Sequence, residues 1–484
     1  MTDQQRADTC HGSNYCKTPN IDAFKAEGID FKQAFCPSPH CCPSRATFFT
    51  GLYPSQHGIW NNVNVANALS HRLNDNVRMF SEDLKEAGYN LTFSGKWHVS
   101  SYEGPKERGW NEAQVTANGD PNKPAQDQFN WDLYRMLSHN APDSFTRDRR
   151  EGEIIRPGYP DYIHYGSNEN PFGDQQVVHQ AIETIKNRTK SDQPWCQYVG
   201  TLGPHDPYCP PQEFIDMYDL EEIQLPDNFS DTMKDKPALY QRTRGVFDQL
   251  SEEEHKKAIL HYLAFCSYED FLFGQLLKAL DESGDRENTL VLYLSDHGDY
   301  MAEHGLWCKG LMCFKSAYHI PAIARWPDGI KAPGREVDSI INLADFAPTF
   351  SELVGKKPDP SLIGNSLIPF FRDEAAPSSW REAHFTQSNG NELYGIQRSI
   401  TTNQWKYVYN GFDYDELYDL GQDPLEVKNL AKEKKYQPLI KELCARIWEF
   451  AYRSNDNAFN PYIMVGLAPL GPGSAFTDPR MEKS

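Results

Sequence analysis

Short apolar runs alternate with amphipathic stretches along the first two-thirds of the chain, and this pattern predicts an α/β fold. Four apolar runs are predicted to be strands: residues 1–2, 89–94, 195–202 and 289–294. Three amphipathic stretches are predicted to be helices: residues 19–27, 78–87 and 254–282. Strands that alternate with helices in this way form a mostly parallel sheet with helices on its faces.

Residues 104–175 interrupt this pattern with a polar stretch rich in proline, glycine and asparagine. Trp110, Trp131, Tyr159 and Tyr162 are scattered through it. The stretch is predicted to be an insertion at one end of the sheet, either a surface excursion or a substrate-binding lid.

A second change of composition, at 373–377, separates a C-terminal segment from the rest of the chain. It contains predicted strands at 384–387 and 405–409, a turn-rich stretch at 417–424 and a predicted helix at 438–452. We therefore expect a large α/β domain at 1–373. A small α+β domain with a short antiparallel sheet is expected at 378–484.

Charge and hydropathy exclude two broad classes of protein. The 484 residues include 48 Lys and Arg against 68 Asp and Glu, a net charge of −20 that repels nucleic acid. No apolar run approaches the ~20 residues that a membrane span needs. We therefore expect neither a nucleic-acid partner nor a membrane partner.

The 11 cysteines are scattered and form no CxxC pair, so zinc ribbons and thioredoxin-type motifs are not supported. Free thiols fit a reducing compartment, and no signal peptide precedes Asp3. The sequence as given therefore predicts a cytoplasmic protein. A periplasmic or secreted location is expected instead if the first strand has been truncated.

Reactive residues follow each predicted strand directly. Asp3 follows the first strand, Lys96 and His98 the second, His205 the third, and Asp296 with His297 the fourth. Ligands of open parallel sheets bind beyond the carboxyl ends of the strands, so these clusters predict one composite site.

The composite site combines metal ligands with cations. Asp3, Asp296 and His297 offer hard oxygens and an imidazole to a divalent cation. The residues Lys96, His98, His205 and Lys309 would form a receptor for a tetrahedral oxyanion beside it. Taken singly, an Asp-His-Gly turn is a common solvated loop and Lys309 a common surface lysine.

Cys41 and Arg45 lie one helical turn apart, and Pro43 suits the first turn of a helix. This places a thiol and a guanidinium at a helix N-terminus, where anions are stabilised. A tyrosine-phosphatase loop would need five residues between its Cys and Arg, whereas three separate Cys41 from Arg45. The alternative is that Cys41 and Cys42 are buried structural cysteines.

The sequence resembles the type I, formylglycine-dependent sulfatases of the alkaline-phosphatase superfamily. Residues 41–51, CCPSRATFFTG, match the signature C-x-P-S-R-x4-T-G at every fixed position. The resemblance extends through Gly95-Lys96-Trp97-His98, Pro204-His205, Ser295-Asp296-His297-Gly298, Glu303–Lys309, Asp345–Thr349 and Glu416–Leu420. It covers nearly the whole chain and implies an alkaline-phosphatase-like central sheet, mixed or mostly parallel and flanked by helices.

The resemblance implies that Cys41 is oxidised to Cα-formylglycine by a formylglycine-generating maturation enzyme. One hydroxyl of the aldehyde hydrate, beside a metal and Arg45, would attack sulfur and displace the alcohol. The second hydroxyl would then lose its proton, so that the hemiacetal collapses and expels sulfate. By similarity, Lys96 and Lys309 would hold sulfate oxygens and Arg45 would orient the nucleophile. His98 would act as the base, and His205 would bind the ester oxygen or protonate the leaving alcohol.

Two positions depart from the family pattern. The family begins with an apolar strand that runs into Asp-Asp, whereas here the strand is Met1-Thr2 and the pair is Asp3-Gln4. We therefore expect a truncated or misassigned start, with the side-chain oxygen of Gln4 offered to the cation. His297 stands where many sulfatases carry Asn. The pair Asp296-His297 resembles instead that of the related phosphonate monoester hydrolases and phosphodiesterases.

The prediction is a sulfatase that hydrolyses a sulfate ester, with a carbohydrate sulfate favoured by the aromatic residues of 104–175. The expected metal ligands are Asp3, Gln4, residue 41, Asp296 and His297, with Ca²⁺ expected ahead of Mg²⁺ or Mn²⁺. One alternative is a phosphonate monoester or phosphodiester hydrolase of the same superfamily. Another is a protein that binds sulfated glycans without turnover.

Overall fold

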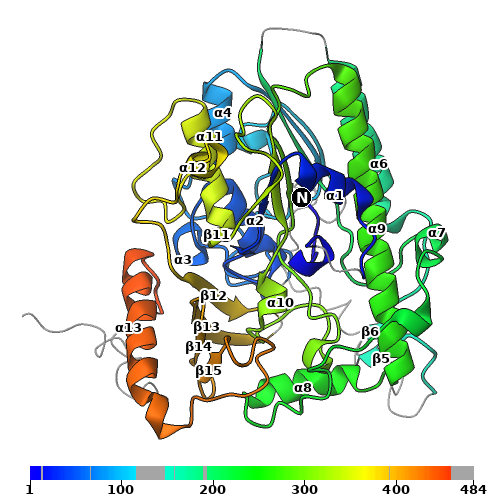
Figure 1. Ribbon diagram of the computed structural model, residues 1–484, viewed down its shortest axis with the longest axis vertical. Coiled ribbons are helices and arrows are strands. Elements are labelled where there is room, and N and C mark those ends of the chain that lie inside the picture. The colour runs from blue at the N-terminus through cyan, green and yellow to red at the C-terminus, as the bar shows by residue number, and fades with distance from the viewer. Residues whose placement is uncertain are drawn as a thin grey trace, which may run out of the picture.

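A mixed, mostly parallel sheet runs through the centre of the computed structural model, and a smaller antiparallel sheet lies at one end (Figure 1). The structure describes residues 1–11, 15–65, 67–115, 148–156, 159–188, 193–391 and 393–458. Helices α6 (Asp174–Lys186) and α9 (Glu252–Ser283) lie on one side of the central sheet. On the other side lie α2 (Cys41–Thr50), α4 (Phe80–Glu86) and α11 (Phe346–Leu353). This is the predicted α/β architecture.

The central sheet consists of two groups of strands. The first has the order β4 (Glu112–Val115), β3 (Asn90–Gly95), β7 (Trp195–Gly200), all parallel. The second has the order β8 (Val291–Leu294), β9 (Ala322–Arg325), β1 (Ile29–Phe31), β10 (Arg335–Val337). Only β9 runs antiparallel to both of its neighbours.

Residues Met1 to Asp3 join these two groups. The Met1 amino group donates to the Val199 carbonyl of β7 at 2.8 Å. On the other side, the Thr2 N–H donates to the Leu294 carbonyl of β8 at 2.8 Å, and Thr2 forms a parallel bridge with Ser295. The predicted first strand is thus reduced to a single β-bridge at Thr2, and these contacts place Asp3 between the ends of β7 and β8.

The long helix α9 begins slightly earlier than its apolar pattern indicates. The Ser251 hydroxyl accepts the Glu254 N–H, and the Glu254 carboxylate accepts the Ser251 N–H. This capping box satisfies backbone donors that have no partner within the helix, so the helix begins at Glu252. The helix ends at Ser283, and Gly284, which follows it, has a φ of 80°.

The described part of the predicted insertion contributes to the core as well as to the surface. Strand β4 is the edge strand of the first group. Trp110 is 1% exposed and packs against Phe93 and Tyr198, so it is not available to stack on a substrate. Residues 116–147, with Trp131, and the side chain of Tyr159 lie outside the described residues.

The C-terminal sheet has the order β12 (His384–Gly390), β13 (Tyr394–Thr401), β14 (Trp405–Asn410), β15 (Glu416–Asp419), all antiparallel. Helix α13 (Gln437–Arg453) packs on it through Ile440, Leu443 and Trp448. The prediction of a turn over 417–424 is wrong at its start, because Leu417 is a buried strand residue. The domain boundaries at 373 and 378 stay a prediction.

The remaining described elements are short. They are η1 (Ala7–Thr9), α1 (Pro19–Ala26), β2 (Ala34–Phe35), α3 (Pro54–His57), η2 (Lys106–Arg108), β5 (Glu153–Arg156), β6 (Tyr159–Ile163), η4 (Pro171–Gly173), α7 (Gln212–Ile215), η5 (Leu220–Glu222), α8 (Ala238–Phe247), η6 (Glu303–Gly305), α10 (Lys315–Tyr318), β11 (Ile341–Asn342), η7 (Leu343–Asp345), α12 (Ile368–Phe371) and η8 (Lys434–Tyr436). Among the described helices, none combines the length and the apolar composition that crossing a bilayer requires.

Candidate active site

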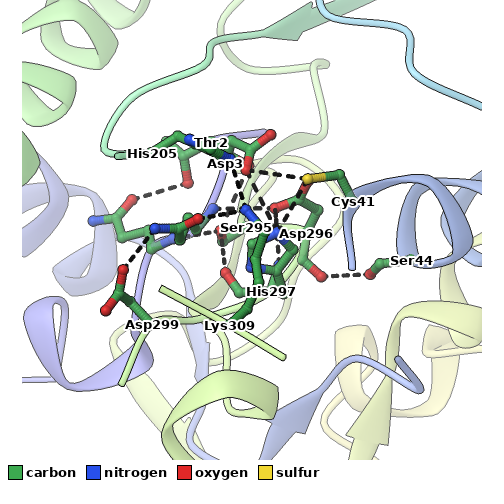
Figure 2. Close-up of polar contacts among 12 residues, drawn as sticks. Thr2, Asp3, Cys41, Ser44, His205, Ser295, Asp296, His297, Asp299 and Lys309 are labelled. Carbon is green, nitrogen blue, oxygen red and sulfur yellow. Dashed lines mark hydrogen bonds and ion pairs between the residues drawn. The ribbon is translucent and has the colours of Figure 1, made fainter. Parts of the chain in front are cut away.

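The predicted site residues meet at the carboxyl ends of neighbouring strands. Lys96 directly follows β3. His205 lies in the loop that follows β7. Asp3 follows the β-bridge at Thr2, and Asp296 follows β8 after one residue. Since these strands are adjacent in the sheet, their reactive residues lie close together, as Figure 2 shows for Asp3, His205 and Asp296.

Four buried side chains form a cluster that can hold a cation: Asp3, Cys41, Asp296 and His297. One potential ligand atom from each lies within 4.8 Å of all the others. The His297 Nε2 atom is 3.5 Å from Asp3 Oδ1 and 3.7 Å from Asp296 Oδ1. Two carboxylates and an imidazole in a buried cluster are a donor set that fits a divalent cation.

The hydrogen bonding of His297 suits a metal ligand. Its Nδ1 atom lies 2.9 Å from the Gly298 carbonyl oxygen, which can only accept, so Nδ1 carries the proton. The unprotonated Nε2 atom therefore faces the cluster. A backbone carbonyl that fixes the imidazole tautomer in this way is typical of histidine ligands.

Arg45 lies beneath the cluster and is fully buried. Its Nε atom donates to Asp296 Oδ2 at 2.8 Å, and Nη2 donates to Asp3 Oδ2 at 3.3 Å. Nη1 donates to the Tyr198 hydroxyl at 3.0 Å and to the Lys96 carbonyl at 3.2 Å. The planar guanidinium thus holds both carboxylates in fixed positions.

Cys41 is the first residue of α2, as its spacing from Pro43 and Arg45 predicts. Burial raises the pKa of its thiol, but Lys309, Lys96 and His297 outweigh burial and hold the pKa well below its ordinary value. The pKa of Cys42, in contrast, is raised, because burial dominates there. Of these two neighbouring cysteines, residue 41 is therefore the one whose surroundings stabilise an anion.

Two lysines flank residue 41. Lys96 forms an ion pair with Asp3, and Lys309 donates to Gln4 Oε1 at 2.5 Å. Despite burial, the pKa of Lys96 is raised by Asp3 and Cys41. Burial and Cys41 raise the pKa of Asp3, but Lys96, His205 and Arg45 outweigh them and hold it below its ordinary value. These side chains form a cationic receptor within an acidic protein.

His205 lies against the second lysine. Its Nδ1 atom is 2.6 Å from the Asp206 carbonyl oxygen and so carries the proton, while Nε2 accepts from Lys309 Nζ at 2.6 Å. Burial and Lys309 lower the pKa of His205, but Asp206, Cys41 and Asp3 outweigh them and raise it. His205 is therefore a titratable group in direct contact with the cationic receptor.

The side chain of Gln4 lies beside the cation cluster and bonds to its neighbours. Its Oε1 atom accepts from Lys309, and its Nε2 atom donates to Asp299 Oδ2 at 2.6 Å. The backbone N–H of Gln4 donates to Asp296 Oδ1 at 3.1 Å. Its predicted role as a metal ligand stays a prediction.

Sequence analysis missed two residues that position this site. Asp174 accepts the backbone N–H groups of Leu202 and Gly203 at 2.7–3.0 Å, which fixes the loop that leads to His205. Burial raises the pKa of Asp174 to about 7. The Asn64 carboxamide oxygen lies 2.9 Å from His98 Nε2. Neither residue belongs to a motif, and both act through contacts between distant parts of the chain.

The fold and the site together define a hydrolase of ester anions with an alkaline-phosphatase-like fold. The family model described as Sulfatase matches residues 1–356. The model described as N-sulphoglucosamine sulphohydrolase, C-terminal, matches residues 302–453. The chain belongs to the sulfatase family and is a sulfuric ester hydrolase.

Relatives with different names share this family. A choline-sulfatase of Rhizobium meliloti is 27% identical over 441 residues, which cover 87% of this chain and 79% of the relative. An N-acetylglucosamine-6-O-sulfatase of Bacteroides thetaiotaomicron is 25% identical over 528 residues, which cover 94% and 86%. The crystal structure of a phosphonate monoester hydrolase of Agrobacterium radiobacter has the same fold, with a TM-score of 0.74 at 23% identity over 95% of this chain and 96% of that one.

Proposed function

We propose that this protein hydrolyses a carbohydrate sulfate, with residue 41 as formylglycine and with one divalent cation. The observation that carries the proposal is the position of residue 41, which belongs to the buried cation-binding cluster and also feels the positive charge of Lys96 and Lys309. An aldehyde hydrate there would supply two hydroxyls on one carbon, one to attack sulfur and one whose deprotonation lets sulfate leave. Maturation requires a formylglycine-generating enzyme as a partner.

Asp3, Asp296 and His297 would hold the cation, together with residue 41 and with Gln4 as a neutral oxygen donor. Two carboxylates favour a hard cation, and we place Ca²⁺ ahead of Mg²⁺ and Mn²⁺. When bound, the cation supplies positive charge that stabilises developing negative charge on oxygen. Arg45 keeps both carboxylates in place beneath it.

The remaining residues act on the substrate. Lys96 and Lys309 hold sulfate oxygens, and His205 donates a proton to the leaving alcohol. His98 is the base that removes a proton from the side chain of residue 41. Burial and Lys96 lower the pKa of His98, which keeps the ring neutral and able to accept that proton.

The preference for a carbohydrate rests on relatives, since Trp110 is buried in the core. The C-terminal half matches a model named for an N-sulphoglucosamine sulphohydrolase, and one relative is an N-acetylglucosamine-6-O-sulfatase. The choline-sulfatase relative makes a small organic sulfate the competing substrate class. A panel of sulfated monosaccharides, choline sulfate and 4-nitrophenyl sulfate decides between them: kcat/KM for the best sugar sulfate must exceed that for both others.

The second candidate function is hydrolysis of phosphonate monoesters or phosphodiesters. It is favoured by His297 at the cluster and by the shared fold of the phosphonate monoester hydrolase. Kinetics on 4-nitrophenyl sulfate and on 4-nitrophenyl phenylphosphonate separate the two functions, because the leaving group is the same. A higher kcat/KM for the phosphonate would replace the sulfatase proposal.

The 11 encoded cysteines all lie in the described part of the chain, and none of them forms a disulfide. Free thiols in this number support a reducing compartment such as the cytoplasm.

A further inference from the structure

The hydrogen bond between His98 and Asn64 determines which nitrogen of His98 carries a proton. The atom of Asn64 that lies 2.9 Å from His98 Nε2 is the carboxamide oxygen Oδ1. An oxygen of this kind only accepts hydrogen bonds, so Nε2 must be the protonated nitrogen of a neutral ring. The other nitrogen, Nδ1, then keeps its lone pair.

That lone pair belongs to a buried atom. His98 is 7% exposed, and Nδ1 has no hydrogen-bond partner within the described residues. The ring of His98 lies close to Cys41, which acts to raise the pKa of His98. An unpaired buried nitrogen next to residue 41 is the acceptor that removal of a proton from this residue requires.

The loop that carries Asn64 is attached to the start of α2. The Cys42 N–H donates to Asn62 Oδ1 at 3.2 Å, and the Val63 N–H contacts Cys42 Sγ at 3.4 Å. On its other side, the Asn62 N–H donates to Asn391 Oδ1 at 3.0 Å, in the turn between β12 and β13. Asn64 therefore has a fixed position relative to residue 41, the residue on which His98 acts.

We propose that Asn64 is a positioning residue that holds His98 in the Nε2–H tautomer, with Nδ1 directed at residue 41. This rests on the proposed function, in which His98 is the base. Among the described residues, Asn64 forms its side-chain hydrogen bond with His98 and not with residue 41, so it acts through the imidazole. Loss of its oxygen would leave the ring free to rotate and to exchange tautomers.

Three variants test the proposal. Asn64→Leu removes the acceptor at similar volume, and Asn64→Asp keeps an acceptor oxygen. Asn67→Leu is the matched control, since Asn67 is an exposed residue of the same loop and accepts the Tyr394 hydroxyl through its backbone carbonyl. With 4-nitrophenyl sulfate, kcat of Asn64→Leu should fall by about 10- to 100-fold with little change in KM. Asn64→Asp should retain most of the activity, and equal kcat values for Asn64→Leu and Asn67→Leu would overturn the proposal.

Nitrogen-15 NMR of histidine-labelled protein reads the tautomer directly, with His98 assigned through His98→Gln. The wild-type protein and Asn64→Asp should show Nε2–H, and Asn64→Leu a mixture of both tautomers. A wild-type ring with its proton on Nδ1, or an unchanged Nε2–H signal in Asn64→Leu, would overturn the proposal. This measurement needs no catalysis. A wild-type protein without sulfatase activity would refute the proposed function, and the NMR result would still decide the role of Asn64.

Discussion

Replacing Arg45 with methionine removes the positive charge from beneath the cation cluster at nearly constant side-chain length. Arg45 is fully buried and donates four hydrogen bonds, two of them to Asp3 and Asp296. Asp3 keeps its ion pair with Lys96, so Asp296 is the carboxylate that loses its cation. Breaking one partner of a buried ion pair costs about 3–5 kcal/mol. We therefore expect the free energy of unfolding of the metal-free protein to fall by about this amount.

Arg398→Met is the matched control for this experiment. Arg398 is also buried and donates to Asp456 at 2.5 and 2.9 Å, but it belongs to the C-terminal sheet. Both variants should be destabilised in EDTA. Of the two variants, Arg45→Met is the one that makes the cation cluster more negative. Saturating Ca²⁺ should therefore stabilise Arg45→Met more than it stabilises Arg398→Met.

The assay is chemical denaturation followed by tryptophan fluorescence, in EDTA and in Ca²⁺. Arg45→Lys serves as a second variant if Arg45→Met does not fold. Lysine keeps the positive charge but lacks the planar guanidinium. The Arg45→Lys variant should therefore be destabilised less than Arg45→Met. Stability of Arg45→Met within about 1 kcal/mol of the wild type in EDTA would refute the electrostatic argument. Equal stabilisation of both methionine variants by Ca²⁺ would refute the placement of the cation.

Three further predictions concern other residues. His57 Nδ1 accepts the Ile59 N–H, and burial lowers the pKa of this ring to about 3. As the pH falls, His57 is therefore protonated in the unfolded state at a higher pH than in the folded state. Stability should therefore fall as the pH drops below the ordinary histidine pKa of about 6.5, by up to ~1.4 kcal/mol per pH unit, and His57→Gln should show a shallower slope in denaturation curves at several pH values. Lys309→Ala should lower kcat/KM by roughly 10²–10³, whereas Lys278→Ala, on the exposed face of α9, should not; equal values would contradict the role of Lys309. Asp296→Asn should abolish the Ca²⁺-dependent rise in thermal stability, and an unchanged rise would exclude Asp296 as a ligand.

The main layers of the fold and the convergence of the site could be predicted because both follow from local patterns. The apolar runs that became β3, β7 and β8 have unambiguous strand patterns, and each is followed by its reactive residues. Parallel packing then brings these residues to one edge of the sheet. The α2 helix could be predicted in the same way from the spacing of Cys41, Pro43 and Arg45.

What could not be predicted depends on contacts between distant segments. Trp110 lies in a polar stretch, and only its packing on Phe93 and Tyr198 makes it a core residue. Strand β15 has turn residues directly after it, and its pairing with β14 decides its structure. Asn64 lies 34 residues before its partner His98, with no local signal that links the two.

Peptide mass spectrometry across residue 41, on protein from its native host, tests the central claim most directly. The account predicts that the Cys41 peptide is lighter than the encoded one by the replacement of one sulfur and two hydrogen atoms with one oxygen, as formylglycine requires. The Cys42 thiol in the same peptide should be unmodified and should react with an alkylating reagent. An intact thiol at residue 41 in protein that hydrolyses sulfate esters would contradict the formylglycine mechanism.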